Sequence, residues 1–245
     1  MSIQTGLLPP AIVKYRPAQS GVDNAGIGET AHGELYLLKI SPEVALAEFV
    51  GASVCATVGI PCGAPAVVEL RGKYVFGSRL ESGVSLPTTP LELLNMVKVC
   101  ANPTVFSAVL AVDLATGNPD RHWHNWLYQP QPSNNGEVLL RAIDFSRAWP
   151  THRPPLDFPQ FRGENTHKCW QDWSTYGVTY DQAAASAACK QLAKLDSEWL
   201  NRLFEQLPVD WMVSADGPAL SQWWSDNWTN RVAATQTFLQ AGAWT

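Results

Sequence analysis

The order of the apolar patterns along the chain is the feature that most constrains its fold. The first third combines short β-type segments, such as ELYLLKI at 34–40, with one stretch of helical spacing at 43–58. The remainder is mainly helical in pattern and is interrupted by one predicted hairpin over 126–146. Because strands and helices do not alternate regularly, a doubly wound parallel sheet is not expected. The sequence predicts instead an α+β, two-lobed architecture.

A stretch rich in Ser, Gly, Pro and Thr at 81–90 is the predicted linker between the two parts. We therefore expect a small, strand-rich N-lobe over residues 1–86 and a mainly helical C-lobe over residues 87–245. Further N-lobe strands are predicted at 66–70 and 73–80, joined by the tight turn Arg71-Gly72. In the C-lobe, helices are predicted at 90–101, 103–116, near 181–207 and at 217–241, with a Pro-rich, extended surface loop at 149–165.

Composition narrows the functional classes. With 17 basic against 22 acidic residues, the 245-residue chain has a net charge of -5, which lacks the basic footprint of a nucleic-acid-binding protein. The N-terminus has no signal-peptide pattern, and no apolar run approaches the roughly 20 residues of a membrane span, so no membrane association is expected. Five scattered cysteines without a CxxC pair indicate neither a zinc site nor a disulfide framework. A cytoplasmic protein is the expectation.

The sharpest chemical signal is a polar loop followed by an acidic strand end. Asp120 and Asn125 lie five residues apart in NPDRHWHN, and Asp144 closes the predicted hairpin that follows. Magnesium favours such oxygen ligands, usually one or two carboxylates together with substrate phosphates. Phosphoryl transfer also needs a carboxylate that orients the attacking hydroxyl. The pattern therefore predicts a phosphoryl-transfer site, although Asp120 and Asn125 could alternatively serve as turn residues after Pro119.

These residues carry a family resemblance. The segments NPDRHWHNWLY and LLRAIDFSRAW resemble the catalytic loop and metal-binding segment of HipA-like kinases, which are distant relatives of protein and phosphatidylinositol kinases. The resemblance implies ATP and Mg²⁺ as cofactors, Asp120 as catalytic base, and Asn125 and Asp144 as magnesium ligands. Upstream, HGELYLLKI and ALAEFVGASV resemble the N-lobe of the family, which implies that Lys39 contacts the α/β-phosphates and that Glu48 pairs with it.

The resemblance spans residues 20–150 firmly and the C-terminal helices loosely. The segment VFGSRLESG resembles the strand that leads into the adenine hinge, which implies Leu80 and Glu81 as adenine neighbours. The loop before the lysine strand contains Gly26 and Gly28, and glycines let backbone N–H groups approach phosphates closely. At 245 residues the chain is short for a full-length HipA toxin, which carries an extra N-terminal subdomain.

The residues themselves support part of this assignment. Period-two alternation puts Leu35, Leu37 and Lys39 on one face of the predicted strand. A lysine at the end of an apolar face is poorly solvated unless it meets a phosphate or a carboxylate. Glu43 and Glu48 both lie on the following helix. We favour Glu48 because it is in mid-helix, whereas an acid in the first turn, like Glu43, favours the helix dipole.

The absence or departure of several known motifs argues against other kinds of nucleotide or metal site. No G-x-x-x-x-G-K-[ST] motif is present, which excludes a Walker-type NTPase. Asp144-Phe145 is followed by Ser146, so a DFG-type flip is not expected. His122 and His124 could supply two zinc ligands, but no third ligand lies at a familiar spacing. In the family pattern His122 is expected instead to brace the catalytic loop from inside.

Three functions follow in order of preference. The first is a kinase that transfers the γ-phosphoryl group of ATP to a Ser or Thr hydroxyl of a protein. The second is a kinase-fold enzyme that phosphorylates a small molecule or lipid head group, and the third is a catalytically degenerate binding module. An antitoxin or another regulatory protein is the partner that the resemblance implies.

Overall fold

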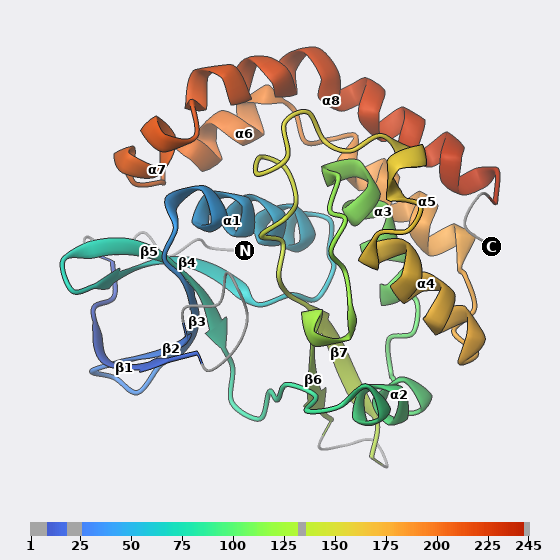
Figure 1. Cartoon of the computed structure of the whole chain (residues 1–245), viewed down its shortest axis with the longest axis horizontal. Helices are drawn as coiled ribbons and strands as arrows, with labels where there is room; N and C mark the ends of the chain where they lie inside the picture. The colour runs from blue at the N-terminus through green and yellow to red at the C-terminus, as the bar shows by residue number, and fades with distance from the viewer. Residues whose placement is uncertain (1–8, 19–25, 132–135, 243–245) are drawn as a thin grey trace.

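The N-lobe is built on a five-stranded antiparallel sheet. The computed structural model describes residues 9–18, 26–131 and 136–242. In the sheet the strands follow the order β1-β2-β3-β5-β4, and the mainly helical C-lobe lies beside it (Figure 1). The strands are β1 (Ile12–Pro17), β2 (Gly26–Thr30), β3 (Leu35–Lys39), β4 (Ala64–Leu70) and β5 (Lys73–Leu80).

Strand β3 separates two environments by its alternation. Tyr36 and Leu38 face a small apolar cluster inside the N-lobe. Leu37 and Lys39 lie on the opposite face, which the alternation predicted for them, and both line a cavity. Their partners on β5 are Ser78 for Leu37 and Phe76 for Lys39, so the same side of β5 also reaches that cavity.

Helix α1 (Pro42–Thr57) is buried on nearly all sides. It begins with Pro42 in the first turn, and every residue from Val44 to Cys55 is buried. Such a helix needs cover around its whole circumference. It packs against β4 and β5 on one side and against helices of the C-lobe on the other. In Figure 1 it lies between the sheet and the C-terminal helices.

The C-lobe is organised around helix α3 (Val105–Thr116), which is buried along its length. The β6–β7 hairpin (Trp126–Pro130 and Val138–Ala142) follows it in the chain, after the short 3-10 helix η1 (Trp123–Asn125). The linker is tied to this hairpin, because Ser85 and Tyr128 exchange two backbone hydrogen bonds. The remaining elements are α2 (Pro90–Lys98), the 3-10 helix η2 (Phe158–Phe161), α4 (Asn165–Thr175), α5 (Gln182–Leu192), α6 (Ser197–Phe204), α7 (Val209–Ser214) and α8 (Gly217–Gln240).

Three sequence predictions for the C-lobe were wrong. The helix predicted near 181–207 is two helices, because the chain breaks after α5 and Asp196 caps the start of α6 through its side chain. Helices α4 and α7 were not predicted, since α4 is rich in polar and aromatic residues and α7 has only six residues. The Pro-rich stretch is not simply a surface loop. Trp149 is 1% exposed and packs on Trp223 and Trp224 of α8.

Helix α7 returns from the C-terminal part of the chain to the N-lobe. Its Trp211 is fully buried, and its ring meets Phe49 of α1 edge to face at 6.5 Å. The indole Nε1 donates a hydrogen bond to the backbone carbonyl of Tyr74 at 3.2 Å. The short helix therefore links the two lobes. Among the described residues, no helix has the length and apolar character required to traverse a bilayer.

Truncation of this anchor should be strongly destabilising. We expect Trp211→Ala to lower the free energy of unfolding by about 3–5 kcal/mol, because it opens a cavity against Phe49 and removes the hydrogen bond to Tyr74. Val213 lies in the same helix and is 75% exposed, so Val213→Ala is the matched control and should change stability by less than about 0.5 kcal/mol. Urea unfolding measures both. Equal, small effects would show that α7 is not an anchor.

Candidate active site

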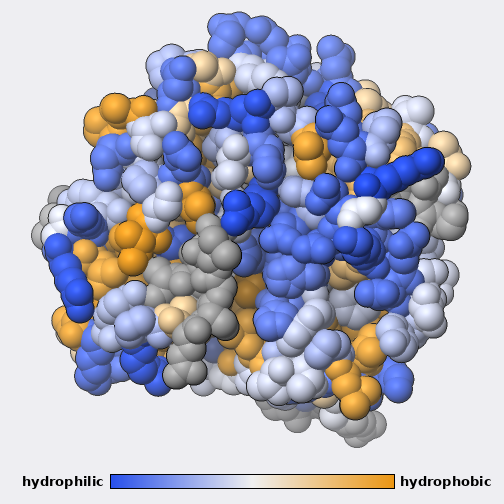
Figure 2. Space-filling view, in the orientation of Figure 1, coloured by the Kyte–Doolittle hydropathy of each residue, from blue (hydrophilic) through white to orange (hydrophobic). Residues whose placement is uncertain are grey.

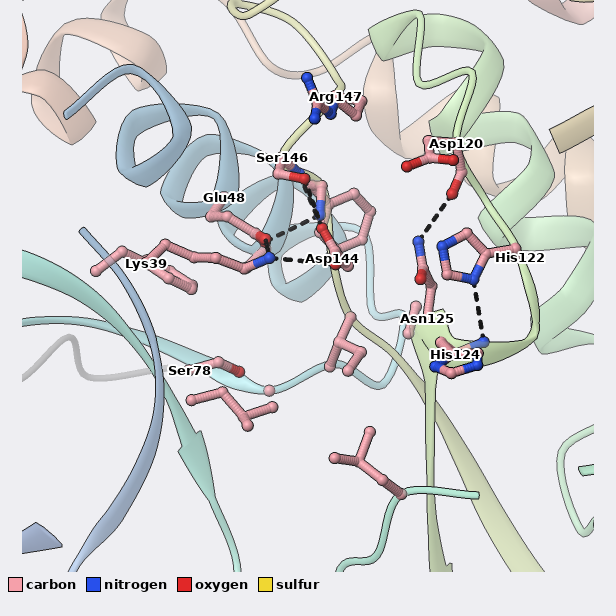
Figure 3. Close-up of a pocket in the computed structure, with 18 residues that line it drawn as sticks. Lys39, Glu48, Ser78, Asp120, His122, His124, Asn125, Asp144, Ser146 and Arg147 are labelled. Carbon is pink, nitrogen blue, oxygen red and sulfur yellow. Dashed lines mark hydrogen bonds and ion pairs between the residues drawn. The ribbon is translucent and has the colours of Figure 1, made fainter. Parts of the chain in front are cut away.

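A cavity of about 490 Å³ lies between the two lobes and gathers the central residues of the sequence prediction. Its lining includes Lys39, Glu48, Asp120, Asn125 and Asp144. Figure 3 shows Lys39 and Glu48 approaching Asp144 from one side, while Asp120 and Asn125 lie on the other side. Segments up to 105 residues apart in the chain thus share one crevice.

Lys39 lies between two carboxylates. Its Nζ is 3.2 Å from Glu48 Oε1 and 3.2 Å from Asp144 Oδ2, and the residue is only 7% exposed. The predicted pairing with Glu48 is confirmed, whereas Glu43 is exposed in the first helical turn. Burial alone lowers the pKa of Lys39, but the two neighbouring carboxylates outweigh it and raise the pKa. The lysine is therefore charged and rigidly placed.

Glu48 also fixes the segment that follows β7. Its Oε2 accepts a hydrogen bond from the backbone N–H of Phe145 at 2.9 Å. One turn further along α1, a Cβ on Gly51 would lie 2.4 Å from Cβ of Phe145, so only glycine permits this close approach. Burial raises the pKa of Glu48 to about 7, with the Asp144 charge acting in the same direction and Lys39 against it.

Asp144 is held in an uncommon conformation with its charge preserved. Its φ of 63° lies in the left-handed region, which non-glycine residues seldom adopt. Oδ1 accepts a hydrogen bond from Ser146 Oγ at 2.7 Å, while Oδ2 meets Lys39. Burial favours the neutral acid, but the Lys39 charge and the Ser146 hydroxyl outweigh it, so the pKa lies well below its usual range. An ionised carboxylate therefore faces the cavity.

Arg121 braces from inside the loop of residues 118–125, which we call the catalytic loop after the sequence prediction. Its guanidinium makes two hydrogen bonds to Asp113 of α3, at 2.8 and 2.9 Å. It also donates to the backbone carbonyls of Asn125 and Ile143, and it stacks 4.7 Å above the Phe145 ring. One side chain thus joins α3, the catalytic loop and the end of β7.

His122, to which the family pattern gave the bracing role, makes a local contact within the same loop. His122 is half-buried at the cavity wall, and its Nδ1 accepts a hydrogen bond from the backbone N–H of His124. The zinc alternative also gains no support. Among the residues that the structure describes, no group of three or more His, Cys, Asp and Glu side chains could hold a metal ion.

Asp120 is fixed by groups on both sides. The Asn125 amide nitrogen donates to the Asp120 backbone carbonyl at 2.9 Å. The Asn165 amide nitrogen, in the first turn of α4, donates to Asp120 Oδ1 at 2.6 Å. The hydroxyl of the next residue, Thr166, accepts a hydrogen bond from the backbone N–H of Arg121 and donates one to the Asn118 carbonyl. Asn165 and Asp120 are 45 residues apart in the chain, so no local sequence pattern indicates their contact.

The predicted nucleotide contacts at the strand ends lie apart from this cavity. Gly26 and Gly28 belong to β2, where Gly28 packs against Ile12 and Leu38 inside the N-lobe. Residues 19–25 of the predicted glycine loop lie outside the described residues. Leu80 ends β5 two residues beyond Ser78, and Glu81 is exposed and pairs with Arg141 at 2.8 Å. A role for these four residues with nucleotide stays a prediction.

The structure adds lining residues that the sequence analysis did not single out. They are Ala52, Gly63, Phe76, Ser78, Leu86, Ala142, Ile143 and Arg147. A Cβ at Gly63 would lie 2.0 Å from the Ser78 hydroxyl oxygen, so a larger residue there would force that hydroxyl to rotate away. The alternation of β5 could have identified Phe76 and Ser78, but only the pairing of β5 with β3 shows which face they share.

Comparisons with known proteins identify the fold. No protein-family model matches the chain, and no curated protein sequence matches it significantly. The crystal structure of the Helicobacter pylori proinflammatory kinase CtkA matches with a TM-score of 0.59 and 13% identity over 97% of this chain and 100% of that one. The Shewanella oneidensis HipA, in complex with HipB and operator DNA, matches with a TM-score of 0.50 and 10% identity over 86% of this chain and 62% of HipA. The chain has the HipA-like kinase fold. The predicted α+β, two-lobed architecture is thereby confirmed.

In this kinase fold, Glu48 should contribute to the stability of the folded protein. We expect Glu48→Ala to lower the free energy of unfolding by about 3 kcal/mol, because Lys39 loses a buried partner and the Phe145 N–H loses its acceptor. Glu48→Gln keeps an acceptor for that N–H and should be destabilised much less. Urea unfolding at pH 7 compares the two, and equal losses would contradict the role of the Phe145 hydrogen bond.

A comparison of the wild type with Glu48→Gln tests the raised pKa of Glu48 through the pH dependence of stability. The folded state holds the Glu48 proton up to about pH 7, whereas in the unfolded chain the pKa of this carboxyl is its ordinary 4.5. Stability from this group is therefore present at low pH and is lost as pH rises through 7. The wild type should lose stability relative to Glu48→Gln between about pH 4.5 and pH 7. A constant difference over that range would exclude a raised pKa.

Proposed function

We propose that the protein is an ATP- and Mg²⁺-dependent kinase that transfers the γ-phosphoryl group to a Ser or Thr hydroxyl of a protein. The observation that carries the proposal is the convergence of the Lys39–Glu48 pair and Asp144 with Asp120 and Asn125 around one cavity. Cation, acid and amide are the parts that phosphoryl transfer requires, and here they occur in the kinase fold.

The residues present fit a magnesium ion. Asp144 is ionised, and the Asn125 amide is oriented through its nitrogen, which leaves its oxygen as an acceptor. One carboxylate and one amide oxygen match the small protein contribution typical of magnesium bound to a nucleotide. When bound, the ion neutralises charge on the phosphate oxygens. That contribution is needed because Lys39 is already matched by two carboxylates, so the lysine alone offers little net attraction to a triphosphate.

In the proposed reaction, Lys39, Glu48 and Asp120 have different roles. Lys39 binds the α/β-phosphates, and Glu48 holds Lys39 in place. Asp120 accepts the proton of the acceptor hydroxyl as its oxygen forms a bond to the γ-phosphorus. The bond from that phosphorus to the β–γ bridging oxygen breaks, and ADP leaves.

The proposal includes the cytoplasm as location and a protein as regulatory partner. All five cysteines are free, which suits a reducing compartment. The similar HipA structure is a toxin–antitoxin complex with HipB. A protein of the antitoxin kind is therefore the partner to test first, with no direct contact between this chain and nucleic acid.

Replacement of the proposed base should separate binding from transfer. We expect Asp120→Asn to lower the rate of phosphoryl transfer by about 10²–10⁴-fold, because the amide cannot accept the proton. ATP affinity should stay within about twofold of the wild type. Transfer of label from γ-labelled ATP to protein measures the rate, and calorimetry measures the affinity. A fully active variant would refute the assigned role.

Replacement of the proposed metal ligand should instead affect nucleotide binding. We expect Asp144→Asn to lose the gain in ATP affinity that Mg²⁺ gives the wild type, because the ionised ligand is gone. Asp210→Asn, an exposed change in the first turn of α7, is the control and should retain the full gain. Titration with ATP in the presence and absence of Mg²⁺ tests both. An undiminished magnesium effect in Asp144→Asn would refute the metal assignment.

A further inference from the structure

A second cavity, of about 430 Å³, adjoins the active site on the far side of the catalytic loop. It lies between α2 and α4, and we call it the α2–α4 groove. Its lining includes Leu93, Leu94, His122, Asn165, Trp173 and Tyr176. The groove is distinct from the cavity that holds Lys39 and Asp144, although His122 lines both.

The groove is linked to the proposed catalytic base, which lines the Lys39 cavity, through Asn165. Asn165 lines it and at the same time donates a hydrogen bond to Asp120 Oδ1 at 2.6 Å. In phosphoryl transfer the attacking and leaving oxygens lie on opposite sides of the phosphorus. With ATP in the Lys39 cavity, the acceptor must reach Asp120 from the other side. The α2–α4 groove opens at that position.

The chemistry of the groove favours an uncharged, partly apolar ligand. Leu93 is 1% exposed and Trp173 5% exposed at its base, while Tyr176 is 58% exposed at its outer end. Its lining contains one lysine and one aspartate, Lys168 and Asp172, one turn apart on α4. Opposite charges in such balance do not form the cation cluster that a phosphate-rich small molecule or an anionic lipid head group needs.

The dimensions favour a chain over a compact molecule. Helix α4 forms one wall from Asn165 to Tyr176, a rise of about 16 Å at 1.5 Å per residue, which matches about five residues of extended polypeptide. Leu91 of α2, outside the groove, is 65% exposed. Figure 2 shows small orange patches at the lower right of this face, where Figure 1 places α2. A polypeptide that leaves the groove would cover this surface as well.

We propose that the α2–α4 groove binds the acceptor as an extended polypeptide, with its Ser or Thr hydroxyl at Asp120 and a large apolar side chain, within about five residues of it, against Leu94 and Tyr176. The inference rests on the proposed kinase function and adds the acceptor's binding site and its sequence preference. Tyr176 and Leu94 act as specificity residues and take no part in the chemical step.

A peptide library tests the preference directly. Peptides with one central Ser or Thr are incubated with the full chain, γ-labelled ATP and Mg²⁺, and each flanking position is varied in turn. We expect Phe, Trp, Leu or Met at one flanking position to raise labelling about tenfold over Gly, Asp or Lys. In Tyr176→Ala and Leu94→Ala, the KM for the preferred peptide should rise about tenfold while the KM for ATP stays unchanged. The matched control is Tyr74→Ala, an exposed tyrosine of the N-lobe that should leave both constants unchanged.

The outcomes separate this inference from the proposed function. If peptides are labelled without apolar preference, or if the groove variants keep the wild-type KM for peptide, the groove is not the acceptor site. If no peptide is labelled but ATP is hydrolysed or label enters a small molecule of a cell extract, the kinase assignment stands and the polypeptide acceptor is refuted. If the wild type binds no Mg²⁺–ATP and turns over none, the proposed function itself fails.

Discussion

The buried ion pair between Asp113 and Arg121 is the interaction on which the rest of the site depends. The two residues are 1% and 3% exposed, and two hydrogen bonds join them. A guanidinium in that position without its carboxylate would be destabilising by several kcal/mol, so the two side chains must stay together. Because Arg121 also binds the carbonyls of Asn125 and Ile143, the pair fixes the catalytic loop and the end of β7 relative to α3. The positions of Asp120 and Asp144 follow from this one arrangement.

The N-lobe contacts the end of β7 and the residues after it from the opposite side. Glu48 accepts the Phe145 N–H, and Gly51 lets the Phe145 ring lie directly on α1. Helix α1 is in turn anchored by Trp211, which comes from the C-terminal part of the chain. The acidic end of β7 is therefore held by both lobes, and its left-handed backbone conformation is maintained by contacts on each side.

The distribution of charge divides the interlobe region into two parts. On one side of the catalytic loop, Lys39, Glu48 and Asp144 form a dense, buried set of charges, which suits a triphosphate and a divalent ion. On the other side, the α2–α4 groove has leucine and aromatic walls with one lysine and one aspartate. Asp120 lines the first of these two cavities and is tied through Asn165 to α4, which forms a wall of the second. In the proposed function, nucleotide and acceptor approach this carboxylate from opposite directions.

The sequence by itself determined the order of the elements and the residues whose role depends on local spacing. The alternation of β3 put Leu37 and Lys39 on one face, and mid-helix position distinguished Glu48 from Glu43. The pattern of loop and hairpin indicated Asp120, Asn125 and Asp144 as site residues. These features are readable because period and turn chemistry are encoded within a few neighbouring residues. The tertiary structure alone decided that Arg121 braces the loop, that Asn165 holds Asp120 across 45 residues, and that Trp149 and Trp211 are core residues. Such contacts join distant segments whose approach is set by packing of the whole chain, and no local pattern records which segments will meet.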